Sequence, residues 1–278
     1  MQLLRAHGLG NDYLVLEDGP KLTPALVRAL CDRHTGVGSD GVLEPIEPQA
    51  ADYGVRIWNP DGSIAEKSGN GLRILARWLV DERGAAQQFS VWTGHAVVRC
   101  RVGQEQIEIE MGKASFAPGK VGLVSSAEVI EQTWQVGSDS LTLTALSVGN
   151  PHCVVFVQQD FEPLPWRQWG AILEKHPEFS GRSNVQFARV LSPHKVQIRI
   201  WERGAGETSA SGSSSCAVVA AGLKTGRLQA GEVEVAMEGG TLYVCIAEDF
   251  DVLLKGPVEV VGRITVDERW LARRREQR

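Results

Sequence analysis

The chain repeats part of itself, and this repeat limits the folds that are open to it. Residues 55–58 read Val-Arg-Ile-Trp and residues 198–201 read Ile-Arg-Ile-Trp, an offset of 143 residues. The same offset relates Ser68-Gly69 to Ser211-Gly212, and a helix-like apolar stretch follows each pair. The chain is therefore predicted to contain two related halves, each with a strand, a turn and a helix that begins at Ser-Gly.

The remaining sequence consists mainly of short strand-like runs separated by turn residues. Many strands and few helices, present in duplicate, predict an α+β fold with two pseudo-symmetric lobes whose sheets wrap a helix. We expect the first lobe to comprise residues 1–113 together with residues 258–278, where the chain returns to it. The second lobe is expected to comprise residues 114–257. The 278 residues are enough for two such lobes.

Composition excludes several classes of protein. The net charge is −5 with both signs interspersed, so no basic stripe of the kind that binds nucleic acid is present. No apolar run reaches the roughly 20 residues of a membrane span, and the N-terminus does not read as a signal peptide. The five cysteines are scattered and odd in number. They predict a reducing, cytoplasmic location without a disulfide framework or a metal site.

The two Ser-Gly turns are candidate anion sites. A helix N-terminus offers unpaired backbone N–H groups and a positive potential, which suit a carboxylate. Glycines at Gly69, Gly71 and Gly212 let a ligand approach the backbone closely. A serine before a helix is ordinarily a simple cap, but its duplication between unlike polar neighbours favours a cleft that binds an asymmetric ligand.

Five segments of the chain resemble the signature motifs of the diaminopimelate epimerase family. They occur in the family's order and extend over nearly the whole sequence. The segments are His7-Gly8-Leu9-Gly10-Asn11-Asp12, Trp58-Asn59-Pro60-Asp61-Gly62-Ser63, Ser68-Gly69-Asn70-Gly71-Leu72-Arg73, Gly149-Asn150-Pro151-His152 and Glu202-Arg203-Gly204-Ala205-Gly206-Glu207-Thr208.

The resemblance implies a cofactor-independent, metal-independent enzyme that interconverts LL- and meso-diaminopimelate for lysine and peptidoglycan synthesis. It implies two lobes, each a barrel-like, mostly antiparallel sheet around a central helix, and a homodimer. In that family one cysteine thiolate removes the α-proton and a cysteine on the opposite side returns a proton. The adjacent helix N-termini bind the α-carboxylate and stabilise the developing negative charge.

The family's roles can be placed on residues of this chain. The resemblance implies that the backbone amides of Gly69-Asn70 and Gly212-Ser213 bind the reacting carboxylate. It also implies that His152 and Glu202 lie beside the reacting centre and tune its protonation. Arg203 is expected to pair with the distal carboxylate. The side chains expected to recognise the substrate are Asn11, Asn59, Asn150, Asn184, Glu202 and Arg203.

The chain departs from the family at both catalytic positions, which carry Ser68 and Ser211 where the family carries cysteine. A free thiol has a pKa of about 8.5, and a helix N-terminus can lower it into the working range. A hydroxyl starts several units higher and is a poor general base near neutral pH unless another group activates it.

Three interpretations remain open from the sequence. The chain is an epimerase in which both cysteines were deliberately replaced by serine, a natural homologue that binds an amino acid without catalysis, or a divergent isomerase that uses serine with help from His152 or Glu202. The retained Asn59, Asn184 and Arg203 argue against a very different substrate. We expect the chain to bind diaminopimelate and to epimerise it very slowly or not at all.

Overall fold

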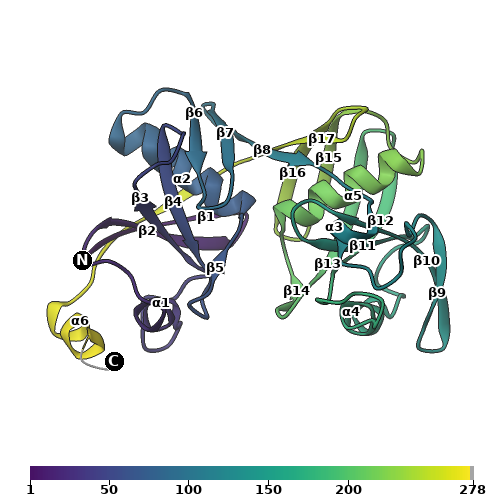
Figure 1. Cartoon of the computed structure of the whole chain (residues 1–278), viewed down its shortest axis with the longest axis horizontal. Helices are drawn as coiled ribbons and strands as arrows, with labels where there is room; N and C mark the ends of the chain where they lie inside the picture. Colours follow the sequence, from purple (N-terminus) through teal and green to yellow (C-terminus); the bar gives the residue numbers. More distant parts are fainter. Residues whose placement is uncertain (276–278) are drawn as a thin grey trace. The chain divides into compact units, whose positions relative to one another are not determined.

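The chain folds into two compact units, shown in a computed structural model that describes residues 1–275 (Figure 1). The first unit comprises Met1–Ile109 together with the segment that starts at Gly256, and the second comprises Glu110–Lys255. The last three residues of the predicted first lobe, 276–278, lie outside the described residues.

Within residues 1–275, the first unit is a sheet with three helices. Its elements are β1 (Gln2–Gly8), β2 (Asn11–Asp18), α1 (Pro24–Cys31), β3 (Val42–Ile46), β4 (Tyr53–Trp58), β5 (Ile64–Ala65), α2 (Gly69–Arg83), β6 (Gln88–Trp92), β7 (Val97–Val102), the start of β8 (Ile107–Lys113), β18 (Glu259–Thr265) and α6 (Glu268–Arg275).

The second unit repeats this plan. Its elements are the end of β8, α3 (Pro118–Val121), β9 (Gln132–Val136), β10 (Asp139–Ser147), β11 (Pro151–Phe156), α4 (Trp166–Glu174), β12 (Asn184–Ser192), β13 (Lys195–Glu202), β14 (Gly206–Thr208), α5 (Gly212–Lys224), β15 (Gly231–Met237), β16 (Gly240–Ile246) and β17 (Asp251–Gly256).

Strand pairing confirms the internal repeat. In the first unit the strands lie in the order β18-β1-β2-β3-β4-β6-β7-β8, with parallel pairs at β2–β3 and β4–β6. In the second unit the order is β9-β10-β11-β12-β13-β15-β16-β17, with parallel pairs at the matching places, β11–β12 and β13–β15. The other pairs in both series are antiparallel. The predicted α+β fold with two pseudo-symmetric, mostly antiparallel sheets is confirmed.

Each parallel pair needs a crossover, and helices provide it. Helix α2 connects the β4–β5 hairpin to β6, and α5 connects the β13–β14 hairpin to β15. Residues 69–76 of α2 are all buried, and so are residues 214–222 of α5. A helix buried on every side has to be apolar or small on every side, which explains the Ala, Val and Gly residues of α5. Each lobe therefore has a central helix, as predicted.

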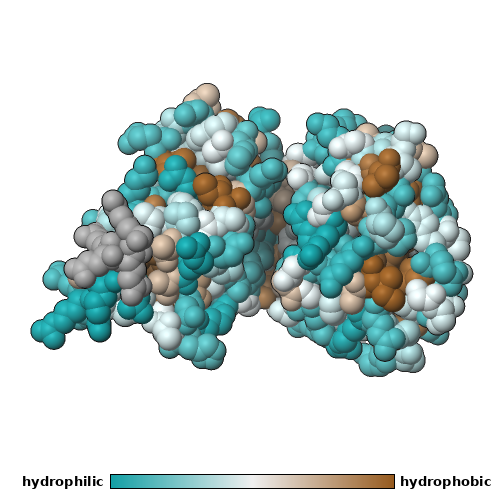
Figure 2. Space-filling view, turned by 60° about the horizontal axis from the view of Figure 1, so that its bottom comes forward, coloured by the Kyte–Doolittle hydropathy of each residue, from teal (hydrophilic) through white to brown (hydrophobic). Residues whose placement is uncertain are grey.

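Helices α1 and α4 pack through apolar side chains on strands of their own units. Leu26, Val27 and Leu30 of α1 form a core with β1 and β2 in the first unit. Trp166, Trp169 and Leu173 of α4 form a core with β10–β12 in the second unit. On the face shown in Figure 2 the surface is mainly hydrophilic, with hydrophobic residues in small separate patches. Among residues 1–275, none of the helices is both long and apolar enough to cross a membrane.

Candidate functional site

Ser68 is the N-cap of the central helix in the first unit. Its backbone is extended (φ −138°, ψ 117°), and its Oγ accepts the N–H of Gly71 at 3.1 Å. This is the ordinary capping geometry of serine. The capping bond leaves the N–H groups of Gly69 and Asn70, the first two of the helix, to other acceptors. Capping by Ser68 therefore uses the third N–H of α2 and not the first two.

Tyr13 is a neighbour of Ser68 that the sequence analysis missed. The phenol oxygen of Tyr13 lies 3.0 Å from Ser68 Oγ, and the tyrosine is 6% exposed. Gly41 makes room for this ring, because a Cβ atom at Gly41 would lie 2.5 Å from Tyr13 Cε1. Tyr13 follows directly after the His7–Asp12 motif, and that position was the available signal.

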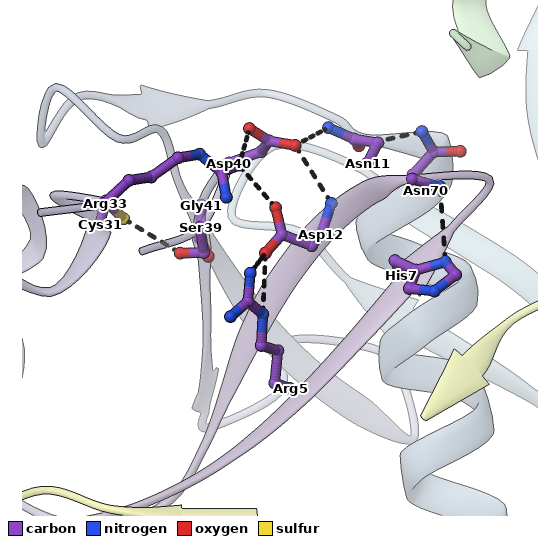
Figure 3. A network of polar contacts seen from close by, with 11 residues as sticks. Arg5, His7, Asn11, Asp12, Cys31, Arg33, Ser39, Asp40, Gly41 and Asn70 are labelled. Atoms are coloured by element: carbon purple, nitrogen blue, oxygen red, sulfur yellow. Dashed lines mark hydrogen bonds and ion pairs between the residues drawn. The ribbon is translucent and has the colours of Figure 1, made fainter. Parts of the chain in front are cut away.

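A chain of hydrogen bonds fixes Asn11 and Asn70 beside this helix end (Figure 3). Asn70 Nδ2 donates to Asn11 Oδ1 at 2.9 Å, and Asn11 Nδ2 donates to Asp40 Oδ2 at 2.9 Å. On the other side, Arg73 Nη2 donates to Asn70 Oδ1 at 2.6 Å. Two of the predicted ligand residues thus contact each other and are held in one orientation by charged groups that the sequence analysis did not assign.

Asp12 links this series of hydrogen bonds to the sheet. Arg5 and Arg33 donate to its two carboxylate oxygens at 2.6 and 2.8 Å, and Arg33 also donates to Asp40 (Figure 3). Burial works to raise the pKa of Asp12, but the bonds and charges of Arg33 and Arg5 outweigh it and lower the pKa below its ordinary value of 3.8. Asp12 is therefore ionised at neutral pH.

Asn59 lies in the turn after β4 and is half-buried. Its Nδ2 donates to Ser63 Oγ at 2.9 Å, and its backbone N–H donates to the Ser63 carbonyl. The preceding residue, Trp58, donates its indole N–H to the buried carboxylate of Glu44 at 2.9 Å. The turn that presents Asn59 is therefore held from both ends.

Ser211 is the N-cap of the central helix in the second unit. Its backbone is extended (φ −151°, ψ 124°), and its Oγ accepts the N–H of Ser214 at 3.5 Å. The bond is again to the third residue of the helix, so the N–H groups of Gly212 and Ser213 remain for other acceptors. Ser211 is 5% exposed, whereas Ser68 is half-buried. The two serine-capped helix N-termini share one backbone geometry but differ in the neighbours of their hydroxyls.

His152 is buried inside the second unit. Its side chain is fully inaccessible, and its Nε2 lies 2.9 Å from Asn150 Oδ1. Burial lowers the pKa of His152 to about 3, a shift that a bond to Gln186 opposes and the charge of Arg203 increases. Gln186 in turn donates to Ser214 Oγ at 3.0 Å. His152 is therefore neutral at physiological pH and positions Asn150 by hydrogen bonding.

The stability of the chain should depend on this histidine below pH 6.5. Because the folded pKa of about 3 lies under the ordinary value of 6.5, the unfolded state binds more protons between these values. The contribution of His152 to stability is fully present above pH 6.5. Below this pH the free energy of unfolding should fall by about 1.4 kcal/mol per pH unit. Urea unfolding of the chain and of His152→Gln across this range measures the effect. Equal pH slopes in the two proteins would contradict it.

Asn184 and Arg203 lie together at one end of the second unit. Asn184 Oδ1 accepts the backbone N–H of Arg203 at 3.0 Å, and its Nδ2 donates to the Pro151 carbonyl at 3.0 Å. Arg203 is exposed, and its Nη1 donates to the Gly181 carbonyl at 3.0 Å. Asn184 therefore joins the Asn150 segment to the Arg203 loop, and the guanidinium group reaches solvent from a fixed base.

Glu202, the last residue of β13, is half-buried beside Arg203. Its carbonyl accepts the N–H of Ala205 at 3.2 Å, which closes a tight turn around Gly204 (φ +80°). The predicted site residues thus form two groups. Asn11, Asn59, Ser68, Gly69 and Asn70 belong to the first unit, and Asn150, His152, Asn184, Glu202, Arg203, Ser211, Gly212 and Ser213 belong to the second.

None of the five cysteines is placed to take over the role of the thiols that the family carries at positions 68 and 211. Cys31, Cys100, Cys153 and Cys216 are buried, and Cys245 is partly buried. Burial raises the pKa of the Cys153 thiol, so less of it is present as the reactive thiolate near neutral pH. Among residues 1–275 no cluster of three or more His, Cys, Asp or Glu side chains is placed to hold a metal ion.

Sequence comparisons identify the family. The protein-family model described as "Diaminopimelate epimerase" matches residues 3–117 and 144–261. "Diaminopimelate epimerase 2" of Nostoc sp. is 40% identical over 270 residues, which cover 93% of this chain and 93% of that protein. "Diaminopimelate epimerase" of Desulforudis audaxviator is 38% identical over 283 residues, which cover 98% of this chain and 99% of the relative. The chain belongs to the diaminopimelate epimerase family.

Solved structures agree at the level of the fold. A hydroxyproline epimerase from Agrobacterium vitis superposes with a TM-score of 0.72 at 15% identity, covering 95% of this chain and 91% of that one. A probable proline racemase from Agrobacterium radiobacter gives a TM-score of 0.70 at 16% identity, covering 96% and 93%. The fold of this diaminopimelate epimerase family member is thus shared with a hydroxyproline epimerase and a probable proline racemase.

Proposed function

We propose that the chain binds diaminopimelate as a diaminopimelate epimerase whose proton transfer is severely impaired by serine at positions 68 and 211. The observation that carries the proposal is the pair of serine-capped helix N-termini at equivalent places in the two lobes. Both capping bonds use the third helical N–H and leave the first two for an anion. The relatives' names supply the substrate.

The two serine-capped helix N-termini are proposed to bind the same substrate. The amides of Gly69-Asn70 and Gly212-Ser213 bind the α-carboxylate and stabilise the negative charge that develops when the α-proton leaves. Arg203 forms a charge-assisted pair with the distal carboxylate. The remaining recognition is by amide groups, from Asn11, Asn59, Asn150 and Asn184.

His152 is proposed to act through hydrogen bonding and not as a base. A group with a pKa of about 3 is a weak proton acceptor near neutral pH. Glu202, which lies next to Arg203 in the same tight turn, is the ionisable group left to tune the protonation of the reacting centre. The resemblance to the family implied that both His152 and Glu202 tune protonation, and the burial of His152 leaves this role to Glu202.

The contact between Tyr13 and Ser68 favours a second candidate, slow proton transfer by the serine itself. Ser68 Oγ accepts the N–H of Gly71 and lies 3.0 Å from the phenol oxygen, a distance at which either hydroxyl can donate to the other. A phenol has a pKa of about 10, which is closer to neutrality than that of an alcohol. Residual turnover of the serine chain would proceed through this pair.

Location and assembly are proposed from the family and the cysteines. All five cysteines are free, which suits a reducing compartment such as the cytoplasm. We propose a homodimer because members of the family usually dimerise.

Binding of LL-diaminopimelate by the serine chain tests the proposal. We expect calorimetry to show one saturable site, and proton NMR in D₂O to show little or no loss of the α-proton signal over the time in which an active epimerase completes exchange. L-lysine, which lacks the distal carboxylate, is the matched ligand and should bind at least about tenfold more weakly. Absence of diaminopimelate binding would overturn the substrate assignment, and rapid exchange would overturn the predicted impairment.

A further inference from the structure

Glu174 is a buried carboxylate that none of the roles above uses. It ends helix α4 and is 5% exposed. Its Oε2 accepts the indole N–H of Trp201 at 3.1 Å, and its Oε1 accepts the backbone N–H of Gly204 at 3.0 Å. Arg182 Nη1 lies 3.5 Å from the same Oε1. One carboxylate thus contacts residues on both sides of Glu202-Arg203.

The same residue also holds the second loop that contacts Arg203. The Glu174 carbonyl accepts the N–H of Ser183 at 3.0 Å, and the guanidinium group of Arg203 donates to the Gly181 carbonyl in this loop. Arg182 has a left-handed backbone (φ +62°), a conformation that a non-glycine residue keeps only when its surroundings enforce it. Glu174 and Asn184 therefore fix the two loops relative to each other within this lobe.

Close packing gives Glu174 a fixed position. On α4, a Cβ atom at Gly170 would lie 2.8 Å from Trp201 Cβ, so the helix rests directly on the tryptophan. Burial works to raise the pKa of Glu174, but the bonds from Trp201 and Gly204 and the charges of Lys175 and Arg182 outweigh it and lower the pKa. The group is ionised, so its bonds to these donors are charge-assisted.

The internal repeat supports a role beyond ordinary core packing. Trp58 and Trp201 are equivalent in the two halves, and each directly precedes predicted ligand residues. Each donates its indole N–H to a buried carboxylate, but Glu44 comes from β3 and Glu174 from α4. Each lobe thus fixes its own equivalent tryptophan by a hydrogen bond to a carboxylate, but the two carboxylates come from non-equivalent elements.

We propose that Glu174 is a positioning residue that holds the Trp201–Gly204 loop so that Arg203 can bind the distal carboxylate of the substrate. This inference rests on the proposed function, because it names a carboxylate at the far end of the ligand. It assigns to Glu174 a contribution to specificity, since only a ligand with that second carboxylate benefits from a fixed Arg203.

The variant Glu174→Gln tests the proposal in the full-length serine chain. Glutamine keeps the shape but points an amide N–H₂ at one of the present donors. We expect the affinity for LL-diaminopimelate to fall about tenfold and the affinity for L-lysine to stay unchanged. A double-mutant cycle with Arg203→Gln should be non-additive, because the second change removes the group through which the first acts.

Glu17→Gln is the matched control. Glu17 accepts the indole N–H of Trp78 at 3.0 Å and a bond from Arg263, and within residues 1–275 its side chain forms no hydrogen bond with a predicted ligand loop. This variant should bind both ligands as the parent does. If Glu174→Gln does not fold, Trp201→Phe removes one N–H donor alone and should weaken diaminopimelate binding in the same direction, by a smaller factor.

The outcomes separate the two proposals. Parallel weakening of both ligands, additivity with Arg203→Gln, or unchanged binding in Glu174→Gln and Trp201→Phe would each overturn the role of Glu174 and leave the proposed function standing. Failure of the parent chain to bind diaminopimelate would overturn the proposed function and this role with it. Selective loss of diaminopimelate binding would support both.

Discussion

Replacing Ser68 and Ser211 together by cysteine is expected to raise the epimerisation of diaminopimelate by at least about 10³-fold over the serine chain. Both positions cap a helix N-terminus, where the positive end of the helix lowers a thiol pKa from about 8.5 toward neutrality. In both helices the capping bond uses the third N–H, and the first two amides are the groups proposed to bind the carboxylate. The formation of meso-diaminopimelate from the LL isomer, followed by NMR in D₂O, measures the change.

The single variants show whether each position serves one face of the substrate. Ser68→Cys alone and Ser211→Cys alone should exchange the α-proton of one stereoisomer only and should invert it far more slowly than the double variant. Tyr13→Phe removes the hydroxyl beside Ser68 and should abolish any residual turnover of the serine chain. If the double variant is no faster than the serine chain, the thiol argument fails and the impairment has another cause.

Replacing Asp12 by asparagine is expected to lower the free energy of unfolding by about 2–3 kcal/mol at neutral pH. The Asp12 side chain is 7% exposed and pairs with both Arg5 and Arg33. Asparagine would leave two arginines without their shared carboxylate and would direct an amide N–H₂ at one of them. Urea unfolding measures the loss. Asp81→Asn is the control, because its pair with Arg77 is long (3.5 Å) and exposed, and it should cost under about 0.5 kcal/mol.

The effect of this substitution should depend on pH with a definite sign. The pKa of Asp12 in the folded chain lies below 3.8, so its contribution is fully present above that value and is lost as the pH falls through the folded pKa. The difference in stability between the chain and Asp12→Asn should therefore shrink in acid. A difference that stays constant into strong acid would show that packing, and not charge, accounts for the loss.

The same substitution should also weaken ligand binding. Asp12 shares Arg33 with Asp40, whose carboxylate fixes Asn11 and, through it, Asn70 (Figure 3). The charged groups of this network hold two amide side chains in one orientation at the start of α2. We therefore expect damage to the network to weaken binding by displacing these amides.

Local patterns determined much of this protein. The duplicated Val-Arg-Ile-Trp and Ile-Arg-Ile-Trp segments became the equivalent strands β4 and β13, and both Ser-Gly turns became helix N-termini. These features were predictable because capping, turn formation and strand alternation depend on residues close in sequence. The same patterns placed Gly69, Asn70, Gly212 and Ser213 at the first turns of the central helices.

Only the tertiary structure decided the surroundings of these groups. Tyr13 reaches Ser68 across 55 residues of sequence, and Glu174 reaches Gly204 across 30, so neither contact leaves a local pattern. His152 has an ordinary motif, yet burial by strands distant in sequence lowers its pKa to about 3 and makes it a hydrogen-bonding residue. Sequence identifies the groups that can do chemistry, whereas the packing of distant segments sets their exposure, their partners and their charge.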